Sequence, residues 1–365
     1  MRVTAVTTWF PTATASSRGS FVVRDLQAIH EHHDIRMVHL VPPQDDDGSR
    51  RSVVDGIDTL RIPMNPKDPW SVLNASRHLR VALRDADLVH SMAFSALLPF
   101  RTGVDTGVPW VHTEHWSAIT TPATLPAPVR PALPLLLKLL RRPTLVTAVC
   151  EYLAAPIRSV RGQGPVEVVP CIVDPHPLTP RRSREDNSLR MVSTGGLIPR
   201  KDPLLAVDTV AELVSRDVDA HLSWIGEGPL RDEVTSRIRD LSLQSRVSLL
   251  GSRSADGVRE GLGEADLFFG PTRADNFFVS AAEAIVAGRP VVLGATGGQG
   301  EYLDSSVGAL VASQTASAYA DAVQDVDART RALSSAQIAS TIGTSFSATE
   351  VGRAYARVYE QALNL

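Results

Sequence analysis

The segment 273–292 places two carboxylates at a spacing that suits the two ends of one ligand. Asp275 and Glu283 bracket a polar loop and the first turns of a predicted helix. An apolar run at 266–271 precedes the segment, and its last residues, 290–293, form a second predicted strand. The first N–H groups of a helix have no partner within the helix and attract anions. The pattern therefore predicts a site for a phosphate-linked sugar.

The two carboxylates differ in how many interpretations they allow. Asp275 is equally suited to capping the helix N-terminus, which is a frequent use of aspartate. Glu283 stands among small and apolar residues, and a carboxylate on such a helix face needs a partner; these neighbours are Ala281, Ala282, Ala284 and Ile285. Eight helical residues span about 12 Å, a separation that fits carboxylates at opposite ends of a sugar nucleotide.

A second polar segment, 193–203, carries Arg200 and Lys201 between a predicted strand and a predicted helix. Its glycines and basic pair set cations beside backbone N–H groups, where a diphosphate would bind. The alternative is a solvated basic pair, although the helix dipole disfavours cations at that end. Lys201 is also one of only three lysines, with Lys67 and Lys138, among 37 basic side chains. We therefore favour anion binding for Lys201.

Two further glycine-containing turns follow predicted strands. In 222–231, Gly226 turns the chain and a proline begins the next helix, so this turn is interpreted as architectural, with close approach of a ligand to Gly226 as the alternative. In 294–301, flexible glycines lie beyond a strand carboxyl end, where doubly wound folds bind ligands. Glu301 in this segment could equally be a first-turn helix acid.

The elements that must position these residues alternate along the chain. Short β-branched runs separated by helical stretches predict βα repeats and parallel sheets covered on both faces. The predicted strands are 3–9, 35–41, 87–91, 110–113, 145–149 and 166–170, then 189–194, 220–225, 247–251, 267–271, 290–293 and 309–312, with helical spacing at 204–214, 229–241 and 281–287.

The length of 365 residues suits two domains. A proline-broken, charged stretch that is poor in apolar residues predicts the linker near 175–188. We therefore expect domains at 1–175 and 176–347, followed by a helix within 348–365.

Composition narrows the class of protein. A net charge of -3 with 21% charged residues argues against nucleic acid as the main partner. The two cysteines, Cys150 and Cys171, fit neither a zinc pattern nor a disulfide framework, so reduced thiols are expected. Without a run of about 18 apolar residues or a signal peptide at the N-terminus, we expect a cytoplasmic protein. The leucine-rich, basic stretch 131–142 is expected to face the core, with weak membrane contact as the alternative.

These segments occur in the order of the motifs of the retaining GT-B glycosyltransferases, and the chain resembles glycosyltransferase family four in particular. The stretch 273–292 resembles the carboxylate-x7-carboxylate signature, 193–203 the G-R-L-x-x-x-K-G loop, and 222–231 the strand with G-x-G-P. The G-G-x-x-E and G-x-L-V motifs match 297–311. The resemblance is good over 189–312 and loose elsewhere. It implies an α/β protein of two Rossmann-like domains with an interdomain cleft, and a last helix returning to the first domain.

The resemblance also implies roles for residues of the second domain. Asp275 would accept hydrogen bonds from hydroxyls of the donor sugar, and Glu283 from the nucleotide ribose. Lys201 aligns with the lysine that binds the diphosphate. The backbone of the helix start would meet the same diphosphate, and the donor-binding residues of this kind are Gly196, Gly226, Asn276, Phe277, Phe278 and Val279.

Departures from the family pattern are informative. The arginine of the family falls on Gly196, so a takeover of its role by neighbouring Arg200 is a hypothesis. Asp275 stands where the family has glutamate, which would alter the donor sugar that fits. Of the glycine loop in the first domain only Gly19 remains, with backbone contact to the diphosphate expected there. His115 aligns with a histidine that contacts the donor sugar or reaction centre, and a purely structural histidine is the alternative.

The implied activity is metal-independent transfer of a sugar, with retention of configuration, from a nucleoside-diphosphate sugar to an acceptor. The acceptor would be a small molecule or a lipid or polysaccharide intermediate, and no cofactor beyond the donor is expected. Two alternatives remain, a sugar-nucleotide epimerase and a non-catalytic sugar-nucleotide-binding relative. The departures at Gly196, Asp275 and the first glycine loop favour the non-catalytic one. The nucleotide base, the sugar and the oligomeric state are left open.

Overall fold

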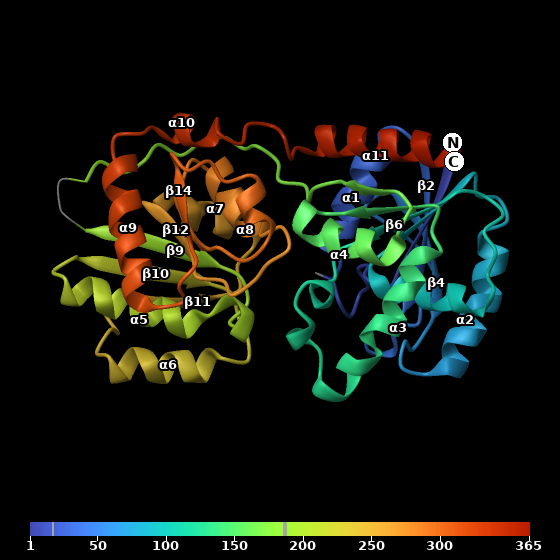
Figure 1. The fold of residues 1–365 in the computed structure, drawn as a ribbon, viewed down its shortest axis with the longest axis horizontal. Coiled ribbons are helices and arrows are strands. Elements are labelled where there is room, and N and C mark those ends of the chain that lie inside the picture. The colour runs from blue at the N-terminus through green and yellow to red at the C-terminus, as the bar shows by residue number, and fades with distance from the viewer. Residues whose placement is uncertain (17, 185–187) are drawn as a thin grey trace. The chain divides into compact units, whose positions relative to one another are not determined.

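The computed structural model describes residues 1–16, 18–184 and 188–365 of the chain, which divides into two compact units (Figure 1). The first unit is Met1–Ile172 together with Ser347–Leu365, and the second is Val173–Phe346. The division falls just before the predicted linker, of which residues 185–187 lie outside the described residues. Ser17 lies outside them as well.

The first unit contains an eight-stranded sheet in the order β3-β4-β2-β1-β5-β6-β7-β8. Neighbouring strands run parallel, as predicted, apart from the antiparallel pair β3 and β4. The strands are β1 (Arg2–Thr7), β2 (Asp34–Val41), β3 (Arg51–Val54), β4 (Ile57–Pro63), β5 (Leu88–Met92), β6 (Trp110–Glu114), β7 (Leu145–Ala148) and β8 (Val166–Val168).

The β3–β4 hairpin at the sheet edge was missed by the sequence analysis, which placed no strand between 41 and 87. Asp55 and Gly56 join the two strands and both have positive φ, 47° and 82°. An Asp-Gly pair between short strands is the usual signal for such a turn. The short length of β3 hid the strand, but the turn residues could have revealed it.

Helices cover both faces of this sheet. The helices α1 (Ser20–His30) and α11 (Ala348–Leu363) pack on each other and share one apolar core with the sheet (Figure 1). The helix α2 (Pro69–Ala82) packs against β2 and β4. The remaining helical segments are η1 (Pro43–Asp45), η2 (Phe94–Thr102), η3 (Ser117–Ile119), η4 (Pro122–Thr124), η5 (Ala127–Ala132), α3 (Leu133–Leu137), η6 (Lys138–Arg141) and α4 (Glu151–Arg161).

The prediction of one core-facing helix at 131–142 is wrong in part. Three short segments, η5, α3 and η6, replace one continuous helix. Leu133 and Leu140 are buried, but Leu135 is 69% exposed. Prolines at positions 131 and 134 explain the break, because proline removes a helix hydrogen bond and clashes with the preceding turn.

The second unit contains a six-stranded, wholly parallel sheet in the order β11-β10-β9-β12-β13-β14. Its strands are β9 (Leu189–Thr194), β10 (Ala220–Ile225), β11 (Val247–Gly251), β12 (Leu267–Gly270), β13 (Val291–Gly294) and β14 (Gly308–Val311). Its helices are η7 (Pro199–Lys201), α5 (Pro203–Ser215), α6 (Arg231–Asp240), α7 (Ala255–Glu264), α8 (Val279–Val286), η8 (Gly298–Glu301), α9 (Ala316–Thr330) and α10 (Ser335–Ala339). The chain order reverses between β9 and β12, which makes this position the switch point of the sheet.

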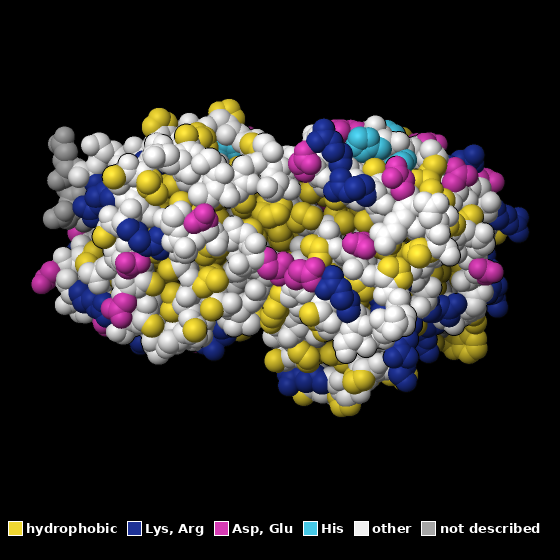
Figure 2. All heavy atoms as spheres, turned by 45° about the horizontal axis from the view of Figure 1, so that its top comes forward, with side chains coloured by type: hydrophobic (Ala, Val, Ile, Leu, Met, Phe, Trp, Pro, Cys, Tyr) yellow, Lys and Arg dark blue, Asp and Glu magenta, His cyan; other side chains and the backbone are white. Residues whose placement is uncertain are grey.

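Charged side chains of both signs are interspersed over the face of the molecule shown in Figure 2, in keeping with the small net charge of -3. Within the described residues, none of the helices combines the length and the apolar character required to cross a membrane.

Candidate functional site

The loops that follow β9 and β12 are joined at the carboxyl edge of the second sheet. The backbone N–H of Arg273 donates to the carbonyl oxygen of Arg200 at 2.8 Å, and Thr272 Oγ1 donates to the same oxygen at 3.1 Å. An ion pair between Arg273 and Asp202, at 2.8 Å, adds to this connection. The two polar segments singled out in the sequence therefore form one structure at the switch point, where open α/β sheets bind ligands.

Three charged side chains meet in this structure. Lys201 Nζ and Arg200 Nη1 each lie 2.6 Å from Asp275 Oδ2. The side chains of Lys201 and Asp275 are only 12% and 16% exposed. The alternative of a solvated basic pair is therefore wrong for Lys201. Two cations on one carboxylate leave the cluster with one excess positive charge, which suits a further anion.

The electrostatics of the cluster keep Asp275 ionised. Burial by itself raises the pKa of the Asp275 carboxyl, but the charges of Lys201 and Arg200 outweigh it and hold that pKa below its ordinary value. Burial lowers the pKa of Lys201, and Asp275 offsets part of the effect. Each charge in the cluster thus depends on the others for compensation.

A third loop, after β13, clamps the backbone of Asp275. The Asp275 N–H donates to Thr296 O, and Gly298 N–H donates to Asp275 O, each at 3.2 Å. Gly297 has φ 138°, and a Cβ at this position would overlap the Asp275 carbonyl oxygen. Glycine is therefore needed at 297 for this close approach, which accounts for part of the glycine-rich segment.

The helix α8 begins with Phe278 as its N-cap, in the left-handed region at φ 58° and ψ 61°. Helix capping by Asp275, the alternative interpretation, is therefore wrong. Asn276 is buried and its carbonyl accepts from Gly298 N–H at 2.8 Å. The Phe277 ring packs against the rings of Tyr302 and Phe346. Val279 is the first residue of the helix.

Glu283 lies on the second turn of α8 and is half-buried. The small and apolar residues predicted around it are all buried, namely Ala281, Ala282, Ala284 and Ile285. Glu283 is thus a carboxylate on an otherwise packed helix face, as the sequence indicated.

The predicted glycines have different functions in the structure. At Gly226, with φ 148°, a Cβ would overlap the carbonyl oxygen of Gly195, which supports the architectural interpretation of this turn. At Gly196 the nearest atom to an added Cβ is Glu227 O at 3.4 Å, so no close approach requires glycine there. The sequence analysis missed Gly195, which has φ 137° and provides the carbonyl oxygen that approaches Gly226. Its position directly after β9 was the available signal.

In the first unit, Gly19 is the N-cap of α1 at φ 69°, and an added Cβ would overlap the Trp9 carbonyl oxygen. His115 follows β6 and its ring lies 4.7 Å from that of Phe21. Burial lowers the pKa of His115 to about 4, more than the nearby Glu114 raises it, so the imidazole is neutral at pH 7.

Glu114 fixes the loop that carries His115, and the sequence analysis did not identify it. Its fully buried carboxylate accepts from the backbone N–H groups of His115 and Trp116, both at 2.8 Å, and lies 3.2 Å from His112 Nε2. The other ring nitrogen of His112 meets Ser91 Oγ at 2.8 Å. His112 is a strand residue, as expected.

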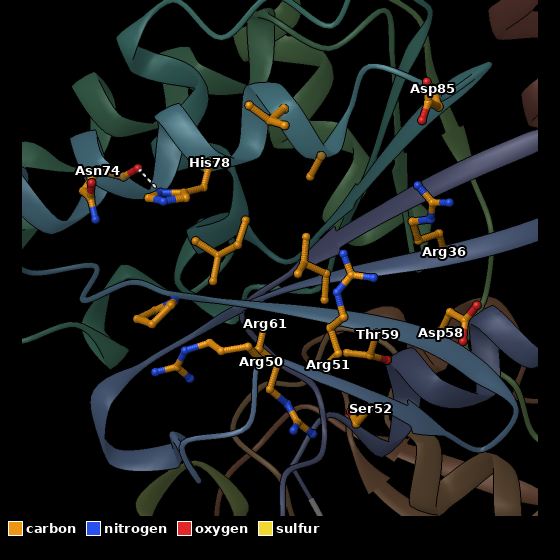
Figure 3. A pocket seen from close by; sticks show the side chains of 15 residues that line it. Arg36, Arg50, Arg51, Ser52, Asp58, Thr59, Arg61, Asn74, His78 and Asp85 are labelled. Carbon is orange, nitrogen blue, oxygen red and sulfur yellow. Dashed lines mark hydrogen bonds between the residues drawn. The ribbon is translucent and has the colours of Figure 1, made fainter.

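A cavity of about 720 Å³ in the first unit lies beside α2, β3 and β4, away from every predicted site residue (Figure 3). Four arginines line it, but two of them are paired elsewhere, Arg50 with Asp46 and Arg61 with Asp47. Two carboxylates also line the cavity, so its charge is close to balanced; the charged lining residues are Arg36, Arg50, Arg51, Arg61, Asp58 and Asp85. This lining selects no particular ligand.

Each unit of the chain matches a known protein family. Residues 188–327 match the family described as Glycosyl transferases group 1, and residues 23–176 match Glycosyltransferase Family 4. One component of the human phosphatidylinositol N-acetylglucosaminyltransferase is 32% identical over 145 residues, which cover 39% of this chain and 29% of that protein. The 2-deoxystreptamine glucosyltransferase of Streptomyces kanamyceticus is 26% identical over 209 residues, which cover 53% of this chain and 54% of that protein. This chain thus matches between about a third and a half of the length of these curated relatives.

Solved structures resemble the whole chain. Sucrose-phosphate synthase from Thermosynechococcus elongatus is 17% identical with a TM-score of 0.81, covering 99% of this chain and 98% of its own. An Anabaena protein in complex with UDP and glucose is 16% identical with a TM-score of 0.74, covering 99% and 100%. At these identities the likeness concerns the fold, and it confirms the predicted GT-B architecture.

Proposed function

The chain belongs to the glycosyltransferases of group 1 and family 4, and from this premise we propose that it transfers a sugar from a nucleoside-diphosphate sugar to an acceptor nucleophile. The observation that carries the proposal is the cluster of Lys201, Arg200 and Asp275 at the switch point of the second sheet. Its excess positive charge and its place beside the start of α8 suit a diphosphate.

Each member of the site has a role in this proposal. Lys201 and Arg200 bind the diphosphate and neutralise the charge that grows on it as it leaves. The N–H groups at the start of α8 add to this stabilisation. Asp275 and Glu283 accept hydrogen bonds from hydroxyl groups, Asp275 from the sugar and Glu283 from the ribose. The complex of the Anabaena protein with UDP and glucose supports a donor of this class.

The reaction itself needs few protein groups. The bond between the anomeric carbon and the diphosphate oxygen breaks, and the acceptor oxygen bonds to the same face of that carbon. The departing phosphate oxygen takes the acceptor proton, so no enzymatic nucleophile, metal or further cofactor is required. His115, neutral at pH 7, would contact the donor sugar without adding charge. The protein accelerates transfer by holding both substrates and stabilising the leaving group.

The acceptor is an alcohol of a small molecule or of a lipid or polysaccharide intermediate. The name of the human relative, which includes phosphatidylinositol, supports a lipid acceptor. The name of the Streptomyces relative, which includes 2-deoxystreptamine, supports a small molecule.

Calorimetric titration with UDP, GDP, ADP and dTDP tests the donor site directly. We expect one nucleotide to bind, and Lys201→Ala and Glu283→Ala to lose it while still showing a cooperative unfolding transition. Absence of binding by all four would overturn the proposal.

Turnover assays then separate the remaining possibilities. Release of nucleotide that depends on added acceptor supports transfer. Conversion of the sugar nucleotide without acceptor indicates an epimerase, and binding without turnover across acceptors indicates a non-catalytic relative.

A further inference from the structure

Phe278 has a backbone conformation that a bulky residue rarely adopts. Its φ of 58° and ψ of 61° lie in the left-handed region, which is readily accessible to glycine and is an outlier for large side chains. Residues in such conformations persist only where the surrounding structure enforces them, and they concentrate at functional sites. The conformation of Phe278 therefore calls for a specific cause.

Contacts on both sides of the residue enforce this conformation. The Phe278 carbonyl accepts from Tyr302 Oη at 2.9 Å and from the N–H of Ala281 at 3.0 Å. The side chain is buried, with its ring packed edge-on against Phe268 at 5.9 Å. Gly270 makes the space, because a Cβ there would lie 2.6 Å from Phe278 Cζ.

The result of this arrangement is that the ring lies under Lys201. Lys201 Nζ is 3.7 Å from the centroid of the Phe278 ring, within the range of a strong cation–π contact. Asp275 Oδ2 contacts the same ammonium at 2.6 Å. A lysine side chain is otherwise flexible, so an aromatic face and a carboxylate together fix its position.

We propose that Phe278 is a positioning residue whose left-handed backbone aims its ring at Lys201 and holds the ammonium where the donor diphosphate binds. This inference rests on the proposed function of the second unit. Phe278 acts on the reaction through Lys201. Its ring stabilises the charged form of a buried lysine and removes freedom that diphosphate binding would otherwise have to restrict.

The same arrangement explains why lysine is kept at 201 in a chain whose basic residues are nearly all arginine. A compact ammonium fits between a ring face and a single carboxylate oxygen, whereas a planar guanidinium presents a wide fork of donors. Arg200 Nη1 contacts that same oxygen, Asp275 Oδ2, at 2.6 Å.

Two variants of Phe278 separate an electrostatic role of the ring from simple space filling. Phe278→Leu keeps an apolar side chain but removes the aromatic face. Phe278→Gly suits the left-handed backbone and opens the space to water. Phe269→Leu is the matched control, because Phe269 is a buried aromatic residue of β12, next to Phe268, that packs on Tyr319 instead.

The readout is the dissociation constant of the nucleotide identified by the titration, measured from pH 6 to pH 10 together with the unfolding temperature. We expect about 3- to 10-fold weaker binding in both Phe278 variants, the size of a partly desolvated cation–π contact. In Phe278→Leu the pKa of Lys201 falls, so the loss of binding at high pH begins at lower pH than in the wild type. In Phe278→Gly, water enters the space beside Lys201 and raises its pKa, so the loss of binding begins at higher pH than in Phe278→Leu. Phe269→Leu should lose stability and keep the wild-type affinity.

Wild-type affinity in Phe278→Leu, with an unshifted high-pH limit, would overturn the inference, because the residue would then only fill space. Failure of the wild-type protein to bind any nucleotide is a different result and overturns the proposed function instead. If the wild type binds, Lys201→Ala loses binding and Phe278→Leu does not, the donor site stands and only the role of Phe278 is wrong.

Discussion

The two sheets have the same kind of switch point, but their strand-end loops are joined by different chemistry. In the first unit the loops after β1 and β5 are held by neutral groups, with Thr7 Oγ1 donating to Met92 O at 3.0 Å and the hydroxyls of Thr8 and Ser95 hydrogen-bonded to each other. In the second unit the corresponding loops, after β9 and β12, are held by Lys201, Arg200 and Asp275. The topology thus provides two equivalent positions, and the side chains decide that only the second carries the charge an anion requires.

The two buried carboxylates show the same contrast. Asp275 is compensated by side-chain cations, which a ligand anion can also engage. Glu114 is held by backbone N–H groups and the His112 ring, which fix a loop and add no excess positive charge for an anion. Variants at these positions should therefore affect ligand binding in the second unit and stability in the first.

The largest expected effect is that of Lys201→Ala. Removal of a donor that stabilises a leaving diphosphate should lower turnover by about 100- to 1000-fold, with steady-state nucleotide release as the measurement. Arg237→Ala, which removes an exposed pair with Asp208, is the control and should leave turnover unchanged. Equal losses in both variants would show that turnover responds to any cation lost from the second unit, and not to the cluster at its switch point.

Glu114→Ala should lower the free energy of unfolding by about 3 kcal/mol, because it breaks a buried charged network. Since Glu114 lies in the first unit, the affinity for nucleotide should stay within twofold of the wild type. Chemical denaturation and calorimetry check the two halves of this prediction. A large loss of nucleotide affinity in the still-folded variant would show that Glu114 also contributes to ligand binding, contrary to the contrast with Asp275.

Acidification should destabilise the first unit selectively. Burial lowers the pKa of His39 and His115 to about 4 and of His90 to about 3. Because these histidines have lower pKa values in the folded protein than in the unfolded chain, the unfolded chain takes up protons at higher pH. The free energy of unfolding therefore falls as the pH drops below about 6.5. Burial raises the pKa of Asp25 to about 7, which acts in the opposite direction for one proton.

The unfolded chain therefore binds about two more protons than the folded protein, and the free energy of unfolding should fall by about 2 kcal/mol between pH 6 and pH 5. Hydrogen exchange followed by mass spectrometry resolves the two units, and protection should fall in residues 1–172 first. Earlier loss of protection in residues 173–346 would contradict the prediction that the acid-sensitive groups lie in the first unit.

Asp275→Asn should tighten binding of the sugar-free nucleoside diphosphate by about tenfold, or 1.4 kcal/mol. The substitution removes the carboxylate that competes with the diphosphate for Lys201 and Arg200. Turnover should fall, because the proposed acceptor of sugar hydroxyl hydrogen bonds is weakened. Calorimetry with nucleotide alone tests the first statement, and weaker binding would mean that Asp275 positions the cations more than it competes with them.

The smallest effect is expected for Arg51→Ala in the charge-balanced cavity of the first unit. Surface substitutions of this kind change stability by less than about 0.5 kcal/mol, and nucleotide affinity should be unchanged in a titration. A clear change in nucleotide affinity would show that this cavity takes part in nucleotide binding.

Much of the fold was predictable because the signals are local. Apolar runs separated by helical stretches located every strand of the second sheet, and the small residues around Glu283 predicted a packed helix face. The hairpin of β3 and β4 was missed because β3 is only four residues long and β4 carries charged residues, although Asp55 and Gly56 carry its turn signal. Proline at two positions split the predicted helix at 131–142, where leucine content alone was misleading.

The sequence by itself determined the alternating strands and helices of the second unit and the presence of Lys201 and Asp275 in loops that follow its strands. Only the tertiary structure decided that these two residues, 74 positions apart, form an ion pair and that Arg200 forms a second one with the same carboxylate. That pairing depends on β9 lying beside β12 although β10 and β11 intervene in the chain, and local periodicity carries no information about such neighbours. The left-handed conformation of Phe278 likewise follows from contacts with distant residues, because its own side chain disfavours it.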